Sequence, residues 1–255
     1  MRFAARFVST LLLLNVSVPL SSVVAQPRPA ILVAAAADLQ PLQNELKSAF
    51  SRFTGREATF IFGASGNLAQ QVRNGAPYDV YLSANDTLVK QLAESGYLLK
   101  DSIQIYGYGR IALWSKGGHI HSLADLTAPA VRHLAIANPV HAPYGAAARA
   151  ALKNQGYWEK LQAKIVYGEN VEQTFQYAES GNADAAIVGW SLVLNRGGIL
   201  LPATWHPRIS QMGGVLKGSR DPVLARRFMA FLAGKEGRAV LRQFGFDLPD
   251  GFGLR

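Results

Sequence analysis

Short apolar runs alternate with amphipathic helical patterns along most of the chain. The first run, residues 31–35, is continuously apolar, which is typical of a strand buried on both faces of a sheet. Leucine and phenylalanine then recur at three- and four-residue spacing from Leu39 to Phe53, which predicts a helix with one apolar face. Asp38 stands at the expected N-cap of this helix, and Pro41 lies in the first turn, where proline is tolerated.

The strand-and-helix unit repeats after this first pair. Continuous apolar runs predict further strands at residues 58–62, 80–82, 133–137, 164–167 and 185–188. Amphipathic patterns predict helices at residues 68–72, 88–92, 146–152, 171–178, 222–231 and 235–244. Because strands alternate with helices, we expect mainly parallel sheets with helices on both faces.

Two extended stretches interrupt the alternation. Residues 103–114 hold two β-rich runs with no helix between them, and residues 211–216 are extended again. We expect both stretches to be hinge crossings between two lobes. Lobe 1 would contain residues 26–108 and 212–255, and lobe 2 residues 109–211. The predicted fold class is therefore α/β, with two lobes that each hold a mainly parallel sheet flanked by helices.

The first 25 residues have the pattern of a secretory signal peptide. Arg2 and Arg6 precede an apolar stretch at residues 11–20, and small residues at positions 23–25 fit a cleavage site. The apolar stretch is too short to span a bilayer. Because the chain has no cysteine for a lipid anchor, we expect an exported protein that diffuses freely in an enclosed compartment, the periplasm.

Composition narrows the classes of function. Of the 255 residues, 49% are hydrophobic and 17% charged, which excludes intrinsic disorder. The 26 basic and 17 acidic residues leave a net charge of +9, but lysine and arginine are scattered without interleaved aromatic residues, so no nucleic-acid partner is expected. The absence of cysteine excludes disulfides, cysteine-based zinc sites, iron–sulfur clusters and thiol nucleophiles.

Four loops between a predicted strand and a predicted helix hold small residues and no lysine or arginine. They are residues 36–38, 63–67, 142–145 and 168–171, two in each predicted lobe. Amides at the start of a helix have no intrahelical partner and carry partial positive charge, so such loops can bind an anion. Composition alone leaves open whether they form one site or are ordinary turns.

Several longer stretches carry a resemblance that general fold rules do not explain. They are VAAAADLQPL, FGASGNLAQQV, GAPYDVYLSANDTLVKQL, NPVHAPYGAAARAAL, GENVEQTF, ADAAIVGWSLV and FLAGKEGRAVLRQFGF. In this order they resemble the periplasmic molybdate-binding proteins of ABC transporters, over the whole chain after the predicted signal peptide. The resemblance implies the two-lobed periplasmic-binding-protein fold, no enzymatic activity and no cofactor. It also implies molybdate or tungstate as ligand, an ABC transporter membrane permease as partner, and a monomer.

The resemblance further implies that amides and hydroxyls of both lobes surround a tetrahedral oxyanion. Ser65 matches a serine that contributes its hydroxyl and its amide. Tyr144 matches a position that donates an amide and in some members a hydroxyl, and Val171 matches a backbone donor. The oxyanion is thus expected to be contacted through Ser65, Tyr144 and Val171. The expected ligand-binding residues are Ala37, Asp38, Ser65, Gly66, Tyr144, Asn170 and Val171.

Two positions depart from the family pattern. Ala37 and Asp38 stand where the first loop often carries serine or threonine. A carboxylate that faces a dianion is repelled, so we expect Asp38 to turn away or to cap its own helix. Gly189 stands where some members have a tyrosine, and Tyr144 is the candidate to supply the missing hydroxyl. These departures leave the preference between molybdate and tungstate open.

Other functions stay open at this stage. The same fold could bind sulfate, phosphate or ferric iron, since Tyr106, Tyr108 and Tyr144 with His141 could imitate an iron site. A serine hydrolase with Ser65 as nucleophile is less favoured, because Gly-Ala-Ser-Gly lacks the spacing of the nucleophile elbow.

A separate metal site is a further alternative. His119 and His121 would share one face of a strand, but no third ligand is apparent near them in the sequence.

Overall fold

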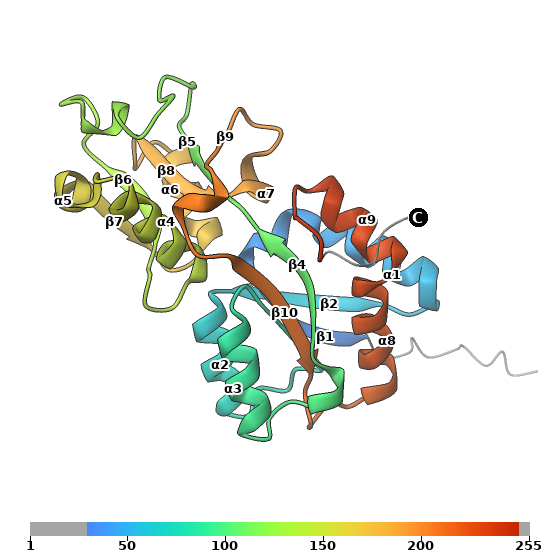
Figure 1. The fold of residues 1–255 in the computed structure, drawn as a ribbon. Coiled ribbons are helices and arrows are strands. Elements are labelled where there is room, and N and C mark those ends of the chain that lie inside the picture. Colours follow the sequence, from blue (N-terminus) through green and yellow to red (C-terminus); the bar gives the residue numbers. More distant parts are fainter. Residues whose placement is uncertain (1–29, 250–255) are drawn as a thin grey trace, which may run out of the picture.

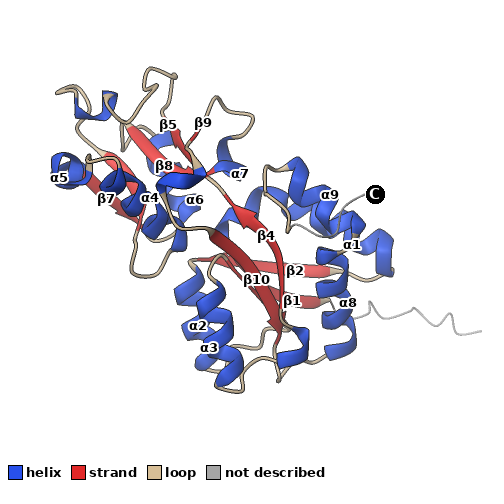
Figure 2. Ribbon diagram, viewed as in Figure 1, coloured by secondary structure: helices blue, strands red, loops and turns tan. Residues whose placement is uncertain are grey.

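The computed structural model describes residues 30–249, which form two lobes (Figure 1). Each lobe is built on a five-stranded sheet flanked by helices (Figure 2). The predicted signal peptide, residues 1–25, lies outside the described residues. Between residues 30 and 249, none of the helices has the length and the apolar character needed to cross a membrane.

The sheet of lobe 1 has the strand order β2-β1-β3-β10-β4. Its strands are β1 (Ile31–Ala36), β2 (Ala58–Gly63), β3 (Val80–Ser83), β4 (Gln104–Gly109) and β10 (Ile209–Val215). The pairs of β1 with β2 and β3 are parallel, whereas β10 is antiparallel to β3 and β4. Because β10 returns from the other lobe, it enters this sheet in the opposite direction.

Helices cover both faces of this sheet. They are the 3-10 helix η1 (Ala37–Leu42) and the α-helices α1 (Gln43–Thr54), α2 (Ser65–Arg73), α3 (Asp86–Glu94), α8 (Pro222–Ala233) and α9 (Lys235–Gln243). Side chains alternate along β1, so Val33 packs in the core under α1, α8 and α9, while Ala34 packs under α2 and α3. The rings of Phe50 and Phe228 meet edge to face at 5.0 Å in the first of these cores.

The sheet of lobe 2 has the strand order β7-β6-β8-β5-β9. Its strands are β5 (Ile111–Trp114), β6 (Leu134–Ala137), β7 (Ile165–Gly168), β8 (Ala185–Gly189) and β9 (Ile199–Leu200). Strand β6 is parallel to β7 and β8, and β5 is antiparallel to β8 and β9. The α-helices of this lobe are α4 (Pro143–Asn154), α5 (Trp158–Leu161), α6 (Val171–Glu179) and α7 (Trp190–Val193).

Two neighbouring strands carry the chain between the lobes. Strand β4 continues into β5 through Arg110, and β10 brings the chain back beside β4, with Ile209 opposite Gly109 (Figure 1). Strand β4 lies in the first stretch predicted as a hinge crossing, whereas β10 overlaps the second but begins earlier, at Ile209. The predicted two-lobed α/β fold is therefore confirmed, but each sheet is mixed rather than mainly parallel, with two parallel and two antiparallel strand pairs.

The structure also contains elements that the sequence pattern did not indicate. The first helix begins with the 3-10 turn η1, which contains Pro41. Helices α5 and α7 and strand β9 have two to four residues each, which is too short for a hydrophobic period to appear. Short 3-10 turns also occur at residues 100–102, 125–127, 162–164 and 203–205.

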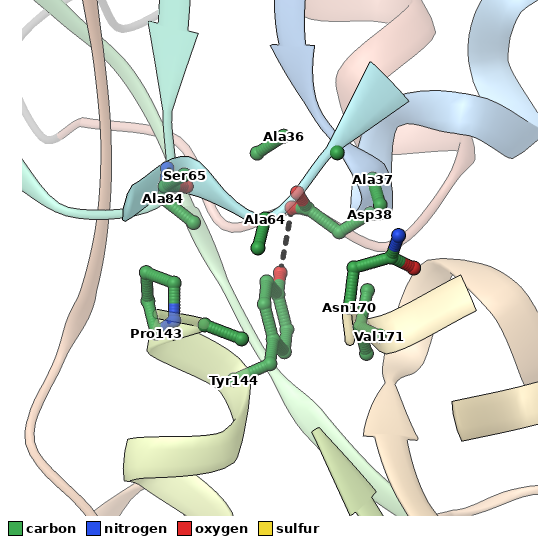
Figure 3. Close-up of a pocket in the computed structure, with 12 residues that line it drawn as sticks. Ala36, Ala37, Asp38, Ala64, Ser65, Ala84, Pro143, Tyr144, Asn170 and Val171 are labelled. Atoms are coloured by element: carbon green, nitrogen blue, oxygen red, sulfur yellow. Dashed lines mark hydrogen bonds between the residues drawn. The ribbon is translucent and has the colours of Figure 1, made fainter. Parts of the chain in front are cut away.

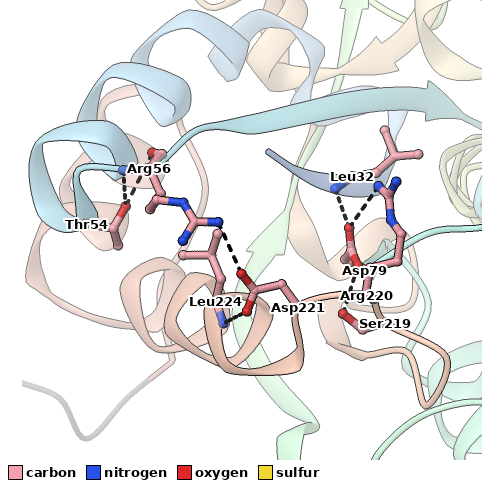
Figure 4. Close-up of polar contacts among 8 residues, drawn as sticks. All are labelled: Leu32, Thr54, Arg56, Asp79, Ser219, Arg220, Asp221 and Leu224. Atoms are coloured by element: carbon pink, nitrogen blue, oxygen red, sulfur yellow. Dashed lines mark hydrogen bonds and ion pairs between the residues drawn. The ribbon is translucent and has the colours of Figure 1, made fainter. Parts of the chain in front are cut away.

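Hydrogen bonds of Asp79 join strand β1 to the segment that follows β10 (Figure 4). The buried Asp79 accepts hydrogen bonds from the amide of Leu32 and from Ser219 and Arg220 on the segment after β10. Burial alone would raise the pKa of Asp79, but these hydrogen bonds lower it below its usual value. Nearby, Asp221 caps α8 through the amide of Leu224.

Candidate functional site

A small cavity lies where the two lobes meet (Figure 3). It is lined by Ala36, Ala37, Asp38, Gly63, Ala64, Ser65, Ala84, Ala142, Pro143, Tyr144, Asn170 and Val171. These residues lie at or shortly after the carboxyl ends of strands β1, β2, β3, β6 and β7, where α/β sheets bind ligands. The free volume is about 10 Å³, close to what a single water molecule needs. In this conformation, therefore, the cavity has no room for an extended organic ligand.

Helix N-termini from both lobes surround the cavity. Ser65 and Val171 are the first residues of α2 and α6, and Tyr144 is the second residue of α4. Amides at these positions have no acceptor within their own helix, and the helix dipole gives them partial positive charge. The lining residues include no lysine or arginine. The site can therefore hold an anion by neutral donors.

Ser65 is held in place by its neighbours and keeps one donor for a ligand. Its side-chain oxygen accepts the amide proton of Ala84 at 3.1 Å, and its carbonyl accepts the hydroxyl of Tyr81 at 2.8 Å. Ser65 is 1% exposed. Within residues 30–249, no protein acceptor takes its hydroxyl proton. This proton is therefore available to a bound anion.

A second buried group, Asp38, links the two lobes. Its Oδ2 accepts hydrogen bonds from the hydroxyl of Tyr144 at 2.8 Å and from Nε2 of Gln211 at 2.7 Å. Gln211 in turn accepts the hydroxyl of Tyr106 at 3.0 Å. Asp38 comes from lobe 1, Tyr144 from lobe 2, and Tyr106 and Gln211 from the crossing strands β4 and β10.

The expected capping role of Asp38 was wrong. The N-cap of η1 is Ala36, and no side chain caps this turn. The carboxylate is instead fully buried and lies on the edge of the cavity, because Tyr144 and Gln211 offer side-chain donors there (Figure 3). Burial raises the pKa of Asp38 to about 6, against the lowering effect of these hydrogen bonds.

Tyr144 occupies space that two glycines leave open. A Cβ on Gly109 would lie 2.1 Å from the Tyr144 hydroxyl, and a Cβ on Gly189 would lie 3.3 Å from the ring. The ring of Tyr144 thus packs against Gly189, the position at which the family resemblance led us to expect a tyrosine in some members. Its hydroxyl proton goes to Asp38, however, so in this conformation the hydroxyl does not donate to the cavity as the resemblance suggested.

Contacts between the lobes also lie beside the cavity. The amide of Gly66 donates to the carbonyl of His141 at 2.9 Å, and Asn67 donates to Glu169 at 3.2 Å. The hydroxyl of Ser191 donates to the carbonyl of Asp38 at 2.7 Å. These contacts bring loops of both lobes together, as in a closed conformation.

The structure brings together most of the residues expected from the sequence. Six of them line the cavity, namely Ala37, Asp38, Ser65, Tyr144, Asn170 and Val171. Gly66 is outside the lining, and its amide donates to the carbonyl of His141. The Asn170 side chain caps α6 by accepting the amides of Glu172 and Gln173. That any of these residues contacts a ligand stays a prediction.

Sequence reasoning missed Gln211 and the role of Tyr106. Gln211 is a fully buried polar residue in a strand whose other residues, apart from Ser210, are apolar or glycine. A glutamine in such a strand needs hydrogen-bond partners, and this was the available signal. Tyr106, named above only as part of a possible iron site, is buried on β4, and its hydroxyl donates to Gln211.

The described residues do not form the sites that a serine hydrolase, an iron-binding protein or a histidine metal site would need. Ser65 has no histidine or carboxylate partner between residues 30 and 249 that could act as a general base. Tyr108 stacks on Arg208, 4.7 Å from its guanidinium, away from the Tyr144 network. In the same part of the chain, no three histidine or carboxylate side chains cluster as a metal site would require, including around His119 and His121.

The chain was compared with known proteins. Residues 31–247 match the family model of the bacterial extracellular solute-binding proteins. The molybdate-binding protein ModA of Azotobacter vinelandii is 33% identical over 226 residues, which cover 86% of this chain and 90% of the relative. ModA of Rhodobacter capsulatus is 31% identical over 85% of this chain and 87% of the relative.

A solved structure extends this similarity to three dimensions. The periplasmic molybdate-binding protein of Azotobacter vinelandii superimposes with a TM-score of 0.82 at 29% identity, covering 86% of this chain and all of the other. The match to the family model, over residues 31–247, includes both lobes and the four loops around the cavity. The chain therefore belongs to the family of bacterial extracellular solute-binding proteins.

Proposed function

We propose that this protein captures molybdate between its two lobes and delivers it to the membrane permease of an ABC transporter. The observation that carries the proposal is the ring of helix N-termini and the Ser65 hydroxyl around a compact cavity without lysine or arginine. The choice of ligand is supported by relatives that are named molybdate-binding proteins and that this chain matches over most of their length. As a solute-binding protein, the chain carries a cargo and is not an enzyme.

Neutral donors suit a tetrahedral dianion in a dry site. A buried charge is costly unless its oxygens are hydrogen-bonded, so the amides of Ser65, Tyr144 and Val171 would replace lost water. Each hydrogen bond to a charged group contributes about 1.5–3 kcal/mol. Selection against sulfate would follow from size, because donors placed for a larger anion cannot all reach a smaller one.

Closure of the lobes would assemble the site. We propose that residues 26–108 with 212–255 move against residues 109–211 about the crossing strands β4 and β10. Opening separates Ser65 from Tyr144 and Val171, which lets the anion enter and leave. The finer points, namely binding of tungstate as well, a monomeric state and export by residues 1–25 as a signal peptide, belong to the same proposal.

Gly66→Ala is expected to weaken anion binding without loss of lobe stability. A Cβ at this position would lie 2.9 Å from the carbonyl oxygen of His141 in the other lobe, so the closed form must shift. Alanine favours the helix α2 itself by up to about 1 kcal/mol. Calorimetry should show a higher Kd, with an unchanged or raised melting temperature of the unliganded protein. Asn67→Ala, which removes the exposed contact to Glu169, is the control and should bind normally.

The direct test of the proposed function is a titration of the purified protein with oxyanions. Molybdate at 100 times its Kd should stabilise the fold by about 2.7 kcal/mol, visible as a rise in melting temperature. Tungstate should act similarly, whereas sulfate and phosphate at the same concentration should shift the melting temperature little. A shift with sulfate, phosphate or ferric iron but none with molybdate would contradict the proposal.

A further inference from the structure

One carboxylate oxygen at the edge of the cavity has no partner. Asp38 is fully buried, and its Oδ1 lacks a hydrogen bond within the described residues. Its other oxygen, Oδ2, already accepts the hydroxyl of Tyr144 and the amide nitrogen of Gln211. An unpartnered buried carboxylate oxygen is costly, and a dianion next to it would add repulsion. Either a donor must therefore reach Oδ1 or the carboxyl group itself must carry a proton.

The position of that hydrogen follows from the hydrogen bonds. Tyr144 and Gln211 both donate to Oδ2, so a proton on the carboxyl group must lie on Oδ1. A protonated Oδ1 would be a donor with no acceptor in the protein, and the cavity that Asp38 lines is the place where an acceptor could lie.

Among residues 30–249, no lysine, arginine or histidine forms an ion pair with Asp38. The titratable groups that approach it are Tyr144 on α4 and Tyr106 on β4, and both keep their protons because burial raises the pKa of each well above the usual value. Of the other elements packed on η1, α6 carries Glu172, Tyr177 and Glu179, and α1 carries Glu45, Lys47 and Arg52. None of these side chains forms a described hydrogen bond or ion pair with Asp38. Strands β1 and β2 and helix α7 carry no titratable side chain.

We propose that Asp38 binds the oxyanion as a neutral carboxylic acid, which donates a hydrogen bond from Oδ1 to an oxygen of the anion. The proton comes from solvent when the ionised form of the free protein binds the anion, so the complex forms with uptake of one proton. Asp38 would thereby replace the hydroxyl donor that the first loop lacks. This inference rests on the proposed function, because it assigns a donor to the same anion.

The proposal has a defined pH dependence. Burial raises the pKa of Asp38 to about 6 in the closed conformation described here. Below that pH the acid is already protonated, so affinity should no longer change with pH. Above it, binding must take up a proton, so Kd should rise about tenfold per pH unit from pH 7 to 8.5.

The experiment is calorimetric titration with sodium molybdate at pH 6.0, 7.0, 7.5 and 8.5, in buffers of different ionisation enthalpy at each pH. We expect uptake of about one proton per anion at pH 7.5 in the wild type. Asp38→Asn should take up none and should have a Kd that is constant over this range. Its amide oxygen can accept from Tyr144 and Gln211, which leaves its NH2 to donate to the anion. Asp38→Leu, with no donor, should bind at least tenfold more weakly than Asp38→Asn at every pH.

Three other results of these titrations would overturn either the role of Asp38 alone or the proposed function as well. Molybdate binding by the wild type without proton uptake at pH 7.5 would overturn the role of Asp38 and leave the proposed function standing. Loss of binding in a folded Asp38→Asn variant would do the same, because it would show that the ionised carboxylate is required. Failure of the wild type to bind molybdate even at pH 6.0 would overturn both proposals.

Discussion

Ser65→Ala is expected to weaken molybdate binding by roughly 10- to 100-fold, which corresponds to the loss of one hydrogen bond to a charged group. The Ser65 hydroxyl lines the cavity, and within residues 30–249 its proton has no protein acceptor. Alanine keeps the backbone amide at the start of α2, so part of the affinity should remain. Calorimetric titration of both proteins with molybdate measures the change.

Ser83→Ala is the matched control for this variant. Ser83 is equally buried, but its hydroxyl exchanges hydrogen bonds with the backbone of Asn85 and it does not line the cavity. Its replacement should lower the free energy of unfolding by about 1 kcal/mol and leave the Kd for molybdate unchanged. If Ser65→Ala bound as the wild type does, Ser65 would have no place in the binding site.

Gly145→Ala is expected to lower the free energy of unfolding by about 3 kcal/mol. A Cβ at this position would lie 1.8 Å from the carbonyl oxygen of Ala137, at the end of β6. Both partners are backbone, so α4 would have to move away from the sheet. That shift would also displace Tyr144, the preceding residue, so molybdate binding should weaken as well. Thermal or urea unfolding, followed by titration at a temperature where the variant is folded, measures both effects.

Gly218→Ala provides the control for a glycine replacement. No heavy atom lies within 4 Å of a Cβ at position 218, so stability and affinity should both stay close to wild type. A Gly145→Ala variant as stable as Gly218→Ala would show that α4 does not pack against β6 as closely as described.

The fold could largely be predicted because its strands are strongly patterned. Continuous apolar runs such as residues 31–35 and 185–188 lie in the centres of the sheets, where both faces are covered, and strands appear there. The antiparallel direction of β5 and β10 follows from the chain crossing between lobes, which no local pattern encodes. The same holds for the short helices α5 and α7, whose form depends on their surroundings.

The site was less predictable than the fold, because its decisive contacts join residues far apart in the sequence. The loops that begin α2, α4 and α6 could be expected from small residues after apolar runs. The hydrogen bonds of Asp38 to Tyr144 and Gln211 bridge 106 and 173 positions, so no local signal indicates them. Local reasoning assigned Asp38 to a cap, whereas burial and distant donors determine its position.

The most direct test of the account is a crystal structure of the molybdate complex, with the anion located by the anomalous scattering of molybdenum. We expect one strong peak in the cavity between the lobes. The anion oxygens should lie about 2.7–2.9 Å from the Ser65 hydroxyl and from amides at the starts of α2 and α6. A peak held by lysine or arginine side chains on the surface, with an empty cavity between the lobes, would contradict the claim that neutral donors of two lobes enclose the anion.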